Sequence, residues 1–462
     1  MKKRLKYIGL CIAFLAVILF INGINPRQVD GNKSFSSGGR DDKATIAVDK
    51  EFVSNLPIVY IDTLGNEIDK TLAIRASISI ADHGENSTSD APDKQMYADI
   101  KFRGNSSYYT FDKKQYHIEL KADIDGDDTI KKSILGMAEA DDWVLNGPFL
   151  DRSLSRNYLG YKVARQLLRW APDTRYCEVF LDGKYQGLYI MIEPITNEKD
   201  RLALSEYSLI SGRTPYVLKT DRVGTEESAI STYGIQSGNY ANEISIDYPV
   251  WKKLTDSQYL YILNDINTIQ EVLYSDYFDN DDAGYSKYID VDSFVDYYII
   301  SEFMMVTDAG NLSTYVYKDL NSKLHITTWD FNNSYNNIPW ENKYYDRFYV
   351  AEANWFSRLL QDRKFVDAVV ERYSQLRLDI LSDDNLINMI DENIKYISDA
   401  ANRNFEVWGY TFKYDLLSPD GDGNIRDPKS YEEAVSMLEN EIKLRGRFLD
   451  ENIEQLYDYC IN

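Results

Sequence analysis

Histidine and cysteine are scarce in this chain of 462 residues, which contains three of each. The histidines are scattered, and no Cys–His pattern with metal-ligand spacing occurs. A zinc site or a Ser-His-Asp hydrolase therefore has little to build on. Cys11 lies in an apolar N-terminal run, so only Cys177 and Cys460 remain outside it. These two can form one disulfide or stay as buried thiols, and their spacing does not decide between the alternatives.

Basic residues are also in deficit. Lys and Arg number 51 against 74 Asp and Glu, which gives a formal net charge of -23 and a pI near 4.6. We expect no nucleic-acid partner, because no surplus of positive charge is present to displace counterions from a phosphate backbone. Hydrophobic residues make up 44% of the chain, which is enough for one large domain or two medium ones.

Long apolar runs are absent except at the N-terminus, where four basic residues within the first six precede the run 7–21. This pattern predicts a signal peptide or membrane anchor over residues 1–23. The run is shorter than the roughly 20 residues of a spanning helix. The cleavage site is poor, which favours an uncleaved or slowly cleaved anchor. Residues 24–45 read as a flexible linker. We expect the remainder to be exported, either membrane-anchored or at the cell surface.

A β-rich region follows over residues 46–200. Strand composition with partial alternation predicts strands at 58–61, 72–80, 97–102 and 113–120. Between the last two stand Arg103, Gly104, Asn105, Ser106 and Ser107. A glycine with small polar neighbours can bring backbone N–H groups against a phosphate. The same residues also suit a simple hairpin turn.

Lysines follow this segment directly. Lys114 shares a strand face with Tyr116 and Ile118, and a strand lysine under such a loop suits a phosphate contact. Lys113, on the other face, is the alternative, and a solvated edge lysine is the plain interpretation. On a later strand, Lys219 is a second candidate for phosphate contact.

Two more strands are predicted at 177–181 and 187–192, and Glu193 follows before a proline. This placement resembles a kinase hinge, whose backbone receives adenine. Glu193 can alternatively reach Lys114, and a strand-ending Glu before Pro is also unremarkable. The Asp-rich stretches 123–128 and 420–424 lack the spacing of a calcium loop, so we treat them as charged loops.

The region 291–333 carries the clearest chemistry. A helix capped by Asp290 or Asp292 should end near 307–310, and strands at 314–317 and 324–328 should form a hairpin around a turn at 318–323. Asp308 and Asp330 then stand at the two open ends of the hairpin, with Asn311 just after the first. Two acids and an amide at one edge suit a hard cation and a phosphate. A helix-capping Asp and a surface Asp are the plain alternative.

The order of these three residues parallels that of protein kinases. There, a loop Asp orients the hydroxyl, an Asn holds metal, and a second Asp after a hairpin holds magnesium. The His-Arg-Asp and Asp-Phe-Gly letters of ordinary kinases are absent. Helical periodicity elsewhere predicts further helices at 153–170, 251–278, 356–376, 386–401 and 431–457.

Several short motifs occur in a fixed order over roughly residues 95–455. They are RGNSS at 103–107, KKQY at 113–116, LG at 135–136, DDWVL at 141–145, DRSLSRN at 151–157, VFLDG at 179–183, GLY at 187–189, LKTD at 218–221 and WDF at 329–331. Each is weak alone. With Asp308 and Asn311, the ordered set resembles the CotH family, the atypical kinases named after a spore-coat protein.

The resemblance implies an α+β, atypical protein-kinase-like, two-lobed fold. It has a β-rich N-lobe over residues 46–200 and a mostly helical C-lobe over residues 201–462. It also implies ATP-dependent transfer of the γ-phosphate to Ser or Thr of a surface or spore-coat-type protein. The alternative is a non-catalytic cell-surface binding protein that keeps the fold. A glycosidase using the two acids would leave the Asn without a role.

In the roles implied by this resemblance, Asp330 and Asn311 hold Mg²⁺ and Asp308 accepts the hydroxyl proton. The nucleotide-binding residues are then Arg103, Gly104, Ser106, Lys114, Glu193 and Lys219. One departure from ordinary kinases stands out. The helix at 153–170 contains no Glu to pair with a strand lysine.

Overall fold

The computed structural model describes residues 51–222, 229–339, 344–417 and 426–461. The predicted anchor, the linker and the Asp-rich stretch 420–424 lie outside these residues. The structure contains both helices and sheets, so the α+β class is confirmed. Within the described ranges no helix has the length and apolar character needed to cross a bilayer.

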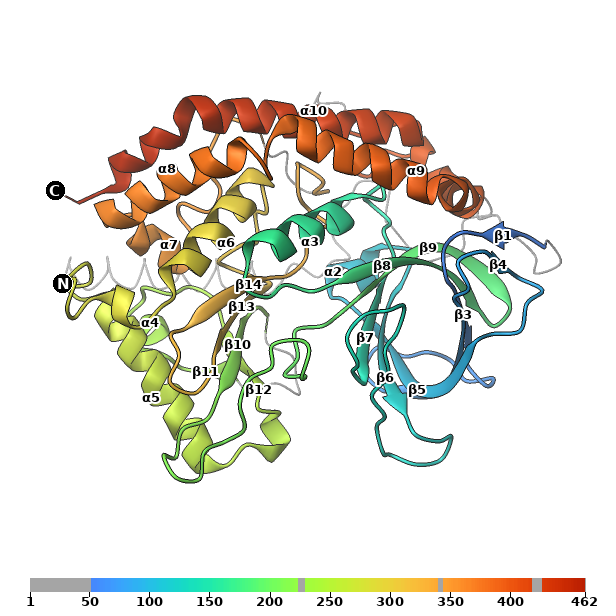
Figure 1. Cartoon of the computed structure of the whole chain (residues 1–462), viewed down its shortest axis with the longest axis horizontal. Helices are drawn as coiled ribbons and strands as arrows, with labels where there is room; N and C mark the ends of the chain where they lie inside the picture. The colour runs from blue at the N-terminus through green and yellow to red at the C-terminus, as the bar shows by residue number, and fades with distance from the viewer. Residues whose placement is uncertain (1–50, 223–228, 340–343, 418–425, 462) are drawn as a thin grey trace, which may run out of the picture.

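The first half of the structure is a closed barrel of seven strands (Figure 1). The strand order is β2-β3-β5-β6-β7-β9-β8, and a parallel pairing of β2 with β8 closes it. Alternate side chains fill the interior with a core of their own. The strands are β2 (Ile58–Asp62), β3 (Ile74–Ala81), β5 (Lys94–Arg103), β6 (Gln115–Lys121), β7 (Asp142–Asn146), β8 (Thr174–Leu181) and β9 (Lys184–Ile192). Two short strands, β1 (Val53–Ser54) and β4 (Asn86–Ser87), pair beside it.

The predicted hairpin is one edge of a second sheet of five strands, in the order β11-β12-β10-β13-β14. This sheet was not predicted, because its other strands lie far from the hairpin in sequence. Its strands are β10 (Tyr216–Thr220), β11 (Ala229–Ile230), β12 (Ile244–Tyr248), β13 (Thr314–Lys318) and β14 (His325–Thr328).

Helices pack around this second sheet and share one large core with it. The main α-helices are α3 (Arg156–Leu167), α5 (Asp256–Leu273), α6 (Val291–Phe303), α7 (Asn354–Leu359), α8 (Arg363–Arg377), α9 (Asp383–Trp408) and α10 (Tyr431–Asn452). The short helices are α2 (Ser106–Thr110), α4 (Tyr233–Gln236), η1 (Trp251–Lys253), η2 (Tyr285–Lys287), η3 (Gly409–Lys413) and η4 (Ile453–Tyr459). Although α3 lies between two barrel strands in sequence, its buried side chains belong to the helical core.

Local capping sets several helix boundaries. The Asp290 carboxylate accepts a hydrogen bond from Ser293 N at 2.9 Å, so Asp290 caps α6. Thr255 and Gln258 form a capping box at the start of α5. The single helix predicted at 356–376 is wrong, because the Asp362 carboxylate caps a new helix at Lys364 N and separates α7 from α8.

Helix α9 joins the barrel to the helical region. Figure 1 shows α9 and α10 running across the top of the molecule, with one end of α9 over the barrel. Asn404 of α9 accepts hydrogen bonds from Leu188 N of β9 at 3.1 Å and from Lys113 Nζ at 2.8 Å. Cys177 is buried in β8, and it and Cys460 are free cysteines rather than a disulfide.

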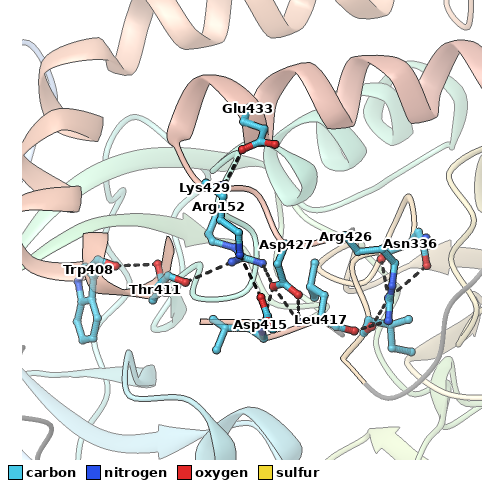
Figure 2. A network of polar contacts seen from close by, with 12 residues as sticks. Arg152, Asn336, Trp408, Thr411, Asp415, Leu417, Arg426, Asp427, Lys429 and Glu433 are labelled. Atoms are coloured by element: carbon cyan, nitrogen blue, oxygen red, sulfur yellow. Dashed lines mark hydrogen bonds and ion pairs between the residues drawn. The ribbon is translucent and has the colours of Figure 1, made fainter. Parts of the chain in front are cut away.

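A buried ion pair holds the chain after α9 against the loop before α3 (Figure 2). Arg152 Nη2 lies 2.5 Å from Asp427 Oδ1, and the two side chains are 1% and 3% exposed. The Asp427 carboxylate also accepts from Leu416 N and Leu417 N, and Arg152 donates to Thr411 O. Leu417 N also donates to Asp427 Oδ2 at 3.0 Å, so both carboxylate oxygens have a partner, which a buried carboxylate requires.

Breaking this pair should destabilise the fold. Asp427→Ala leaves the Arg152 guanidinium buried without its anion, and we expect the free energy of unfolding to fall by about 3–5 kcal/mol. Chemical denaturation measures this. As a control, Asp281→Ala removes an exposed partner of Lys364 and should change little. Equal stabilities for the two variants would contradict the structural role of the buried pair.

Candidate functional site

The residues predicted at the RGNSS segment and at the ends of the hairpin line one cleft of about 450 Å³. Arg103, Gly104 and Ser106 contribute from the barrel side, and Asp308 and Asp330 from the second sheet. The cleft is also lined by Gln115, Asp221, Arg222, Trp329, Asn332 and Asn333. Its lining among the described residues does not include four predicted site residues, which are Asn311, Lys114, Glu193 and Lys219.

The RGNSS segment is a tight turn that leads into helix α2. Gly104 has φ +89°, and a Cβ there would lie 2.1 Å from Ser107 Oγ. The left-handed backbone conformation is what favours glycine here, since the Ser107 hydroxyl could rotate away from an added Cβ. The Lys114 ammonium donates to Tyr108 O at 2.6 Å and to Phe111 O at 2.7 Å, at the end of α2. Lys114 therefore fixes the end of α2 and, with it, the RGNSS segment that lines the cleft.

Lys113 has a different environment. Its side chain is 1% exposed and donates to Leu188 O at 2.6 Å and to Asn404 Oδ1. Burial holds the pKa of Lys113 well below its ordinary value. These partners belong to β9 and α9, so Lys113 secures the junction between the barrel and that helix.

Glu193 and Lys219 also occupy fixed places. The buried Glu193 carboxylate accepts from Ala138 N at 3.1 Å and from Asp173 N at 3.0 Å, so it ties two loops to the end of β9. Lys219 lies within β10, where its backbone pairs with Ser245 and Tyr315. Glu193 and Lys114 thus have separate hydrogen-bond partners.

Hydrogen bonds from neighbouring elements fix the backbone of the loop that carries Asp308. Gly310 N donates to Thr314 Oγ1 at 2.9 Å and to the buried Tyr297 hydroxyl at 3.2 Å. Asn354 Nδ2 donates to Gly310 O at 2.7 Å. The Asp308 carbonyl accepts from Asn311 N at 3.0 Å, which closes the turn between the two predicted site residues. The loop backbone is therefore fixed before any ligand binds.

Asp330 has a left-handed backbone conformation, with φ 68°. Helix α3 supports it at two points. Asp330 N donates to the Tyr161 hydroxyl at 3.1 Å, and Phe331 N donates to Asn157 Oδ1 at 2.8 Å. A Cβ at Gly160 would lie 2.3 Å from the Phe331 ring, so the helix can approach this closely only with glycine there.

Negative charge gathers around Asp330. Burial raises the pKa of its half-buried carboxyl, and Asp308 and Asp221 raise it further, while the Asn332 backbone N–H and Arg103 lower it. The Arg103 guanidinium lies 5.2 Å from the centre of the Trp329 ring. Burial and repulsion between neighbouring carboxylates both disfavour the charged form of Asp330, and a bound divalent cation would offset this cost.

The donors present fit Mg²⁺ better than zinc. In the part of the chain that the structure describes, no group of three or more His, Cys, Asp or Glu is arranged to hold a metal. Mg²⁺ needs few protein ligands, because it keeps waters and binds phosphate oxygens. Asp330 and Asp308 line the same cleft and can supply the carboxylate oxygens.

A family model described as CotH kinase protein matches residues 100–449. The chain belongs to the CotH family. The match includes the RGNSS segment and both ends of the hairpin, so the cleft is built from residues within the CotH region. A search of the curated proteins finds no match.

Sequence reasoning missed one acid of this CotH cleft. Asp221 follows β10 directly, and Thr220 pairs with Thr314, which in turn pairs with Thr328. This register brings the end of β10, the start of β13 and the end of β14 to one edge of the sheet. Asp221 follows its strand much as Asp330 follows β14, and that signal was available in the sequence.

The raised pKa of Asp330 has a measurable consequence. Above that pKa the carboxylate costs folding free energy, and below the ordinary value of 3.8 the carboxyl is protonated in the folded and unfolded chain alike. Asp330→Asn should therefore raise the free energy of unfolding at neutral pH, with the gain fading as the pH falls. Asn also tolerates the left-handed conformation.

Urea denaturation of both proteins across this pH range measures the difference. Asp281→Asn is the control, because Asp281 is exposed and its pairing with Lys364 contributes little, so its replacement should leave the stability nearly unchanged at every pH. A loss of stability in Asp330→Asn at neutral pH would contradict the electrostatic cost assigned to this carboxylate.

Proposed function

We propose that this CotH-family chain is an ATP- and Mg²⁺-dependent protein kinase. It transfers the γ-phosphate to Ser or Thr of a surface or spore-coat-type protein. One observation carries the proposal. The glycine turn with Arg103 and the two acids Asp308 and Asp330 line the same cleft, although they come from distant parts of the sequence. Phosphoryl transfer needs this combination of positive charge, backbone N–H groups and carboxylates.

The glycine turn and Asp308 then have distinct roles in the transfer. Arg103 and the turn at Gly104 and Ser106 neutralise and orient the phosphates, with Lys114 holding that turn in place. The bond between the γ-phosphorus and the β–γ bridging oxygen breaks as a bond forms to the Ser or Thr oxygen. The hydroxyl proton passes to Asp308, and the products are ADP and the phosphorylated protein.

Asp330 would hold the magnesium ion. Asn311 is proposed as its second ligand from the kinase parallel alone, since it follows the Asp308 turn but is not part of the cleft lining. When bound, the ion supplies positive charge to the β- and γ-phosphate oxygens. The backbone bonds from Asp330 and Phe331 to α3 keep the Asp330 carboxylate in place. In this proposal the barrel serves as the N-lobe and the second sheet with its helices as the C-lobe of a kinase-like fold.

A second candidate is a non-catalytic surface protein that keeps the fold. One observation favours it. Lys114 donates to the carbonyl groups of Tyr108 and Phe111 in the segment just before it. In addition, α3 contains no Glu that could pair with a lysine and orient it toward a phosphate. In this case the cleft would bind a ligand without turnover.

Two substitutions separate the roles of the acids. Asp330→Ala should abolish Mg²⁺-dependent ATP binding and turnover together, because it removes the metal ligand. Asp308→Ala should keep most of the ATP affinity and lose turnover by roughly two to four powers of ten, the usual effect of losing a positioned base. Calorimetric titration with ATP and incorporation of labelled phosphate measure the two quantities.

The control is Asp281→Ala, which removes an exposed acid that is not part of the cleft lining and should match the wild type in both assays. Equal losses of ATP affinity in both cleft variants would refute the assigned roles. ATP binding by the wild type without transfer to any acceptor or to itself would favour the surface-binding candidate.

We also propose that the kinase acts outside the cell membrane, anchored through its N-terminal segment. The basic start and the apolar run 7–21 support this. Protease added to intact cells should digest the chain beyond residue 45, and an immunoblot follows the loss. A cytoplasmic protein serves as the lysis control. Full protection of the chain in intact cells would contradict the topology.

A further inference from the structure

Gln115 lines the cleft and has no role in the mechanism above. It is the first residue of β6, and its backbone pairs directly with Arg103 at the end of β5. Side chains of directly paired residues lie on the same face of a sheet, about 5 Å apart. Gln115 is therefore a neighbour of the arginine that is proposed to contact phosphate. Its side chain is only 7% exposed, so its orientation is restricted.

A chain of buried amides fixes which end of the Gln115 side chain faces the cleft. The chain starts at a backbone group, Phe331 N, which can only donate. Its acceptor is Asn157 Oδ1, at 2.8 Å. The Asn157 Nδ2 group must therefore be the donor to Asn146 Oδ1, at 3.0 Å. This assignment does not depend on the protonation of Asp330.

The same logic passes along the next link. Because Asn146 Oδ1 accepts from Asn157, Asn146 Nδ2 is its donor end, and it donates to Gln115 Oε1 at 3.1 Å. The oxygen of Gln115 is thus used, and its Nε2 group remains. Among the described residues, no protein group accepts a hydrogen bond from Gln115 Nε2.

A second branch agrees with this direction. Asn157 Nδ2 also donates to Asn332 Oδ1, and Asn332 Nδ2 donates to the Asp330 carboxylate. An ionised carboxylate can only accept, so the orientation of Asn332 is fixed from its other end. Both branches require Asn157 to present Nδ2 to its side-chain neighbours.

We propose that Gln115 is a ligand-binding residue whose Nε2 group donates a hydrogen bond to an anionic oxygen of the phosphate chain bound beside Arg103. This inference rests on the proposed function. The amide chain holds Gln115 as a donor, since turning its side chain over would set Gln115 Nε2 against Asn146 Nδ2. Two donors facing each other in a buried site would leave both unsatisfied.

Gln115→Glu tests the inference, because the new side chain has almost the same shape and can still accept from Asn146 Nδ2. It presents a negative oxygen to the cleft in place of an N–H donor. Calorimetric titrations with Mg²⁺–ATP and with inorganic tripolyphosphate should both show affinity lower by roughly 10- to 100-fold. Gln95→Glu is the matched control, since it adds the same charge to an exposed position of β5 outside the cleft lining. It should bind as the wild type does.

The pH dependence separates a direct contact from a structural effect. As the pH falls toward the ordinary glutamate pKa of about 4.3, the introduced carboxyl takes up a proton and regains a donor. The affinity ratio between wild type and Gln115→Glu should then shrink toward one, whereas a distorted cleft would keep the ratio constant. Gln115→Met, which has no donor, should weaken binding at every pH.

The outcomes distinguish the two proposals. If the wild type binds both probes and Gln115→Glu and Gln115→Met bind equally well, the role of Gln115 is overturned and the proposed function stands. A pH-independent ratio also overturns the direct contact. If the wild type binds neither probe, the proposed function fails, and the inference about Gln115 fails with it.

Discussion

Two hydrogen bonds of Asn157 join the halves of the candidate site: its Oδ1 accepts from Phe331 N after β14, and its Nδ2 donates to Asn146 Oδ1 of the barrel strand β7. Asn157 belongs to α3, which lies between barrel strands in sequence but packs in the helical core. Phe331 follows the aspartate at the end of β14. The glycine at position 160 lets the Phe331 ring lie against α3, and Tyr161 accepts from Asp330 N. The barrel, the helix and the acid turn therefore cannot move independently without losing buried polar partners.

The neutral character of this connection matters in an acidic protein. An ion pair in the same place would require two charges to leave water, at a cost that its Coulomb attraction barely recovers. A row of amides carries no net charge, so burial costs less and salt does not screen it. It also has a direction, because each amide has one donor end and one acceptor end. The amide chain thereby couples the barrel to the orientation of the Asp330 turn. It does so without adding a charge beside the carboxylates of Asp221, Asp308 and Asp330.

Local patterns predicted most of the elements that carry the site. Alternation located β5, β6 and the β13–β14 hairpin, and the cap of α6 was correctly placed at Asp290 as one of two candidates. Closure of the barrel was not predictable, because β2 and β8 pair in parallel across a long sequence separation. The break at Asp362 was also missed, since the apolar periodicity continues across it and only the cap reveals the new helix.

The site itself shows the same division. Four residues that were predicted to lie together do line one cleft, namely Arg103, Gly104, Asp308 and Asp330. They could be predicted because strand ends and tight turns have recognisable sequence patterns. The lysines were harder. A period of two separates Lys113 from Lys114, but it cannot say that one is buried under α9 while the other closes the loop of α2. The helix predicted at 153–170 lacks the Glu that pairs with a strand lysine in ordinary kinases. In the structure, Asn157 and Tyr161 contact the backbone of the acid turn directly, so α3 supports Asp330 rather than a strand lysine.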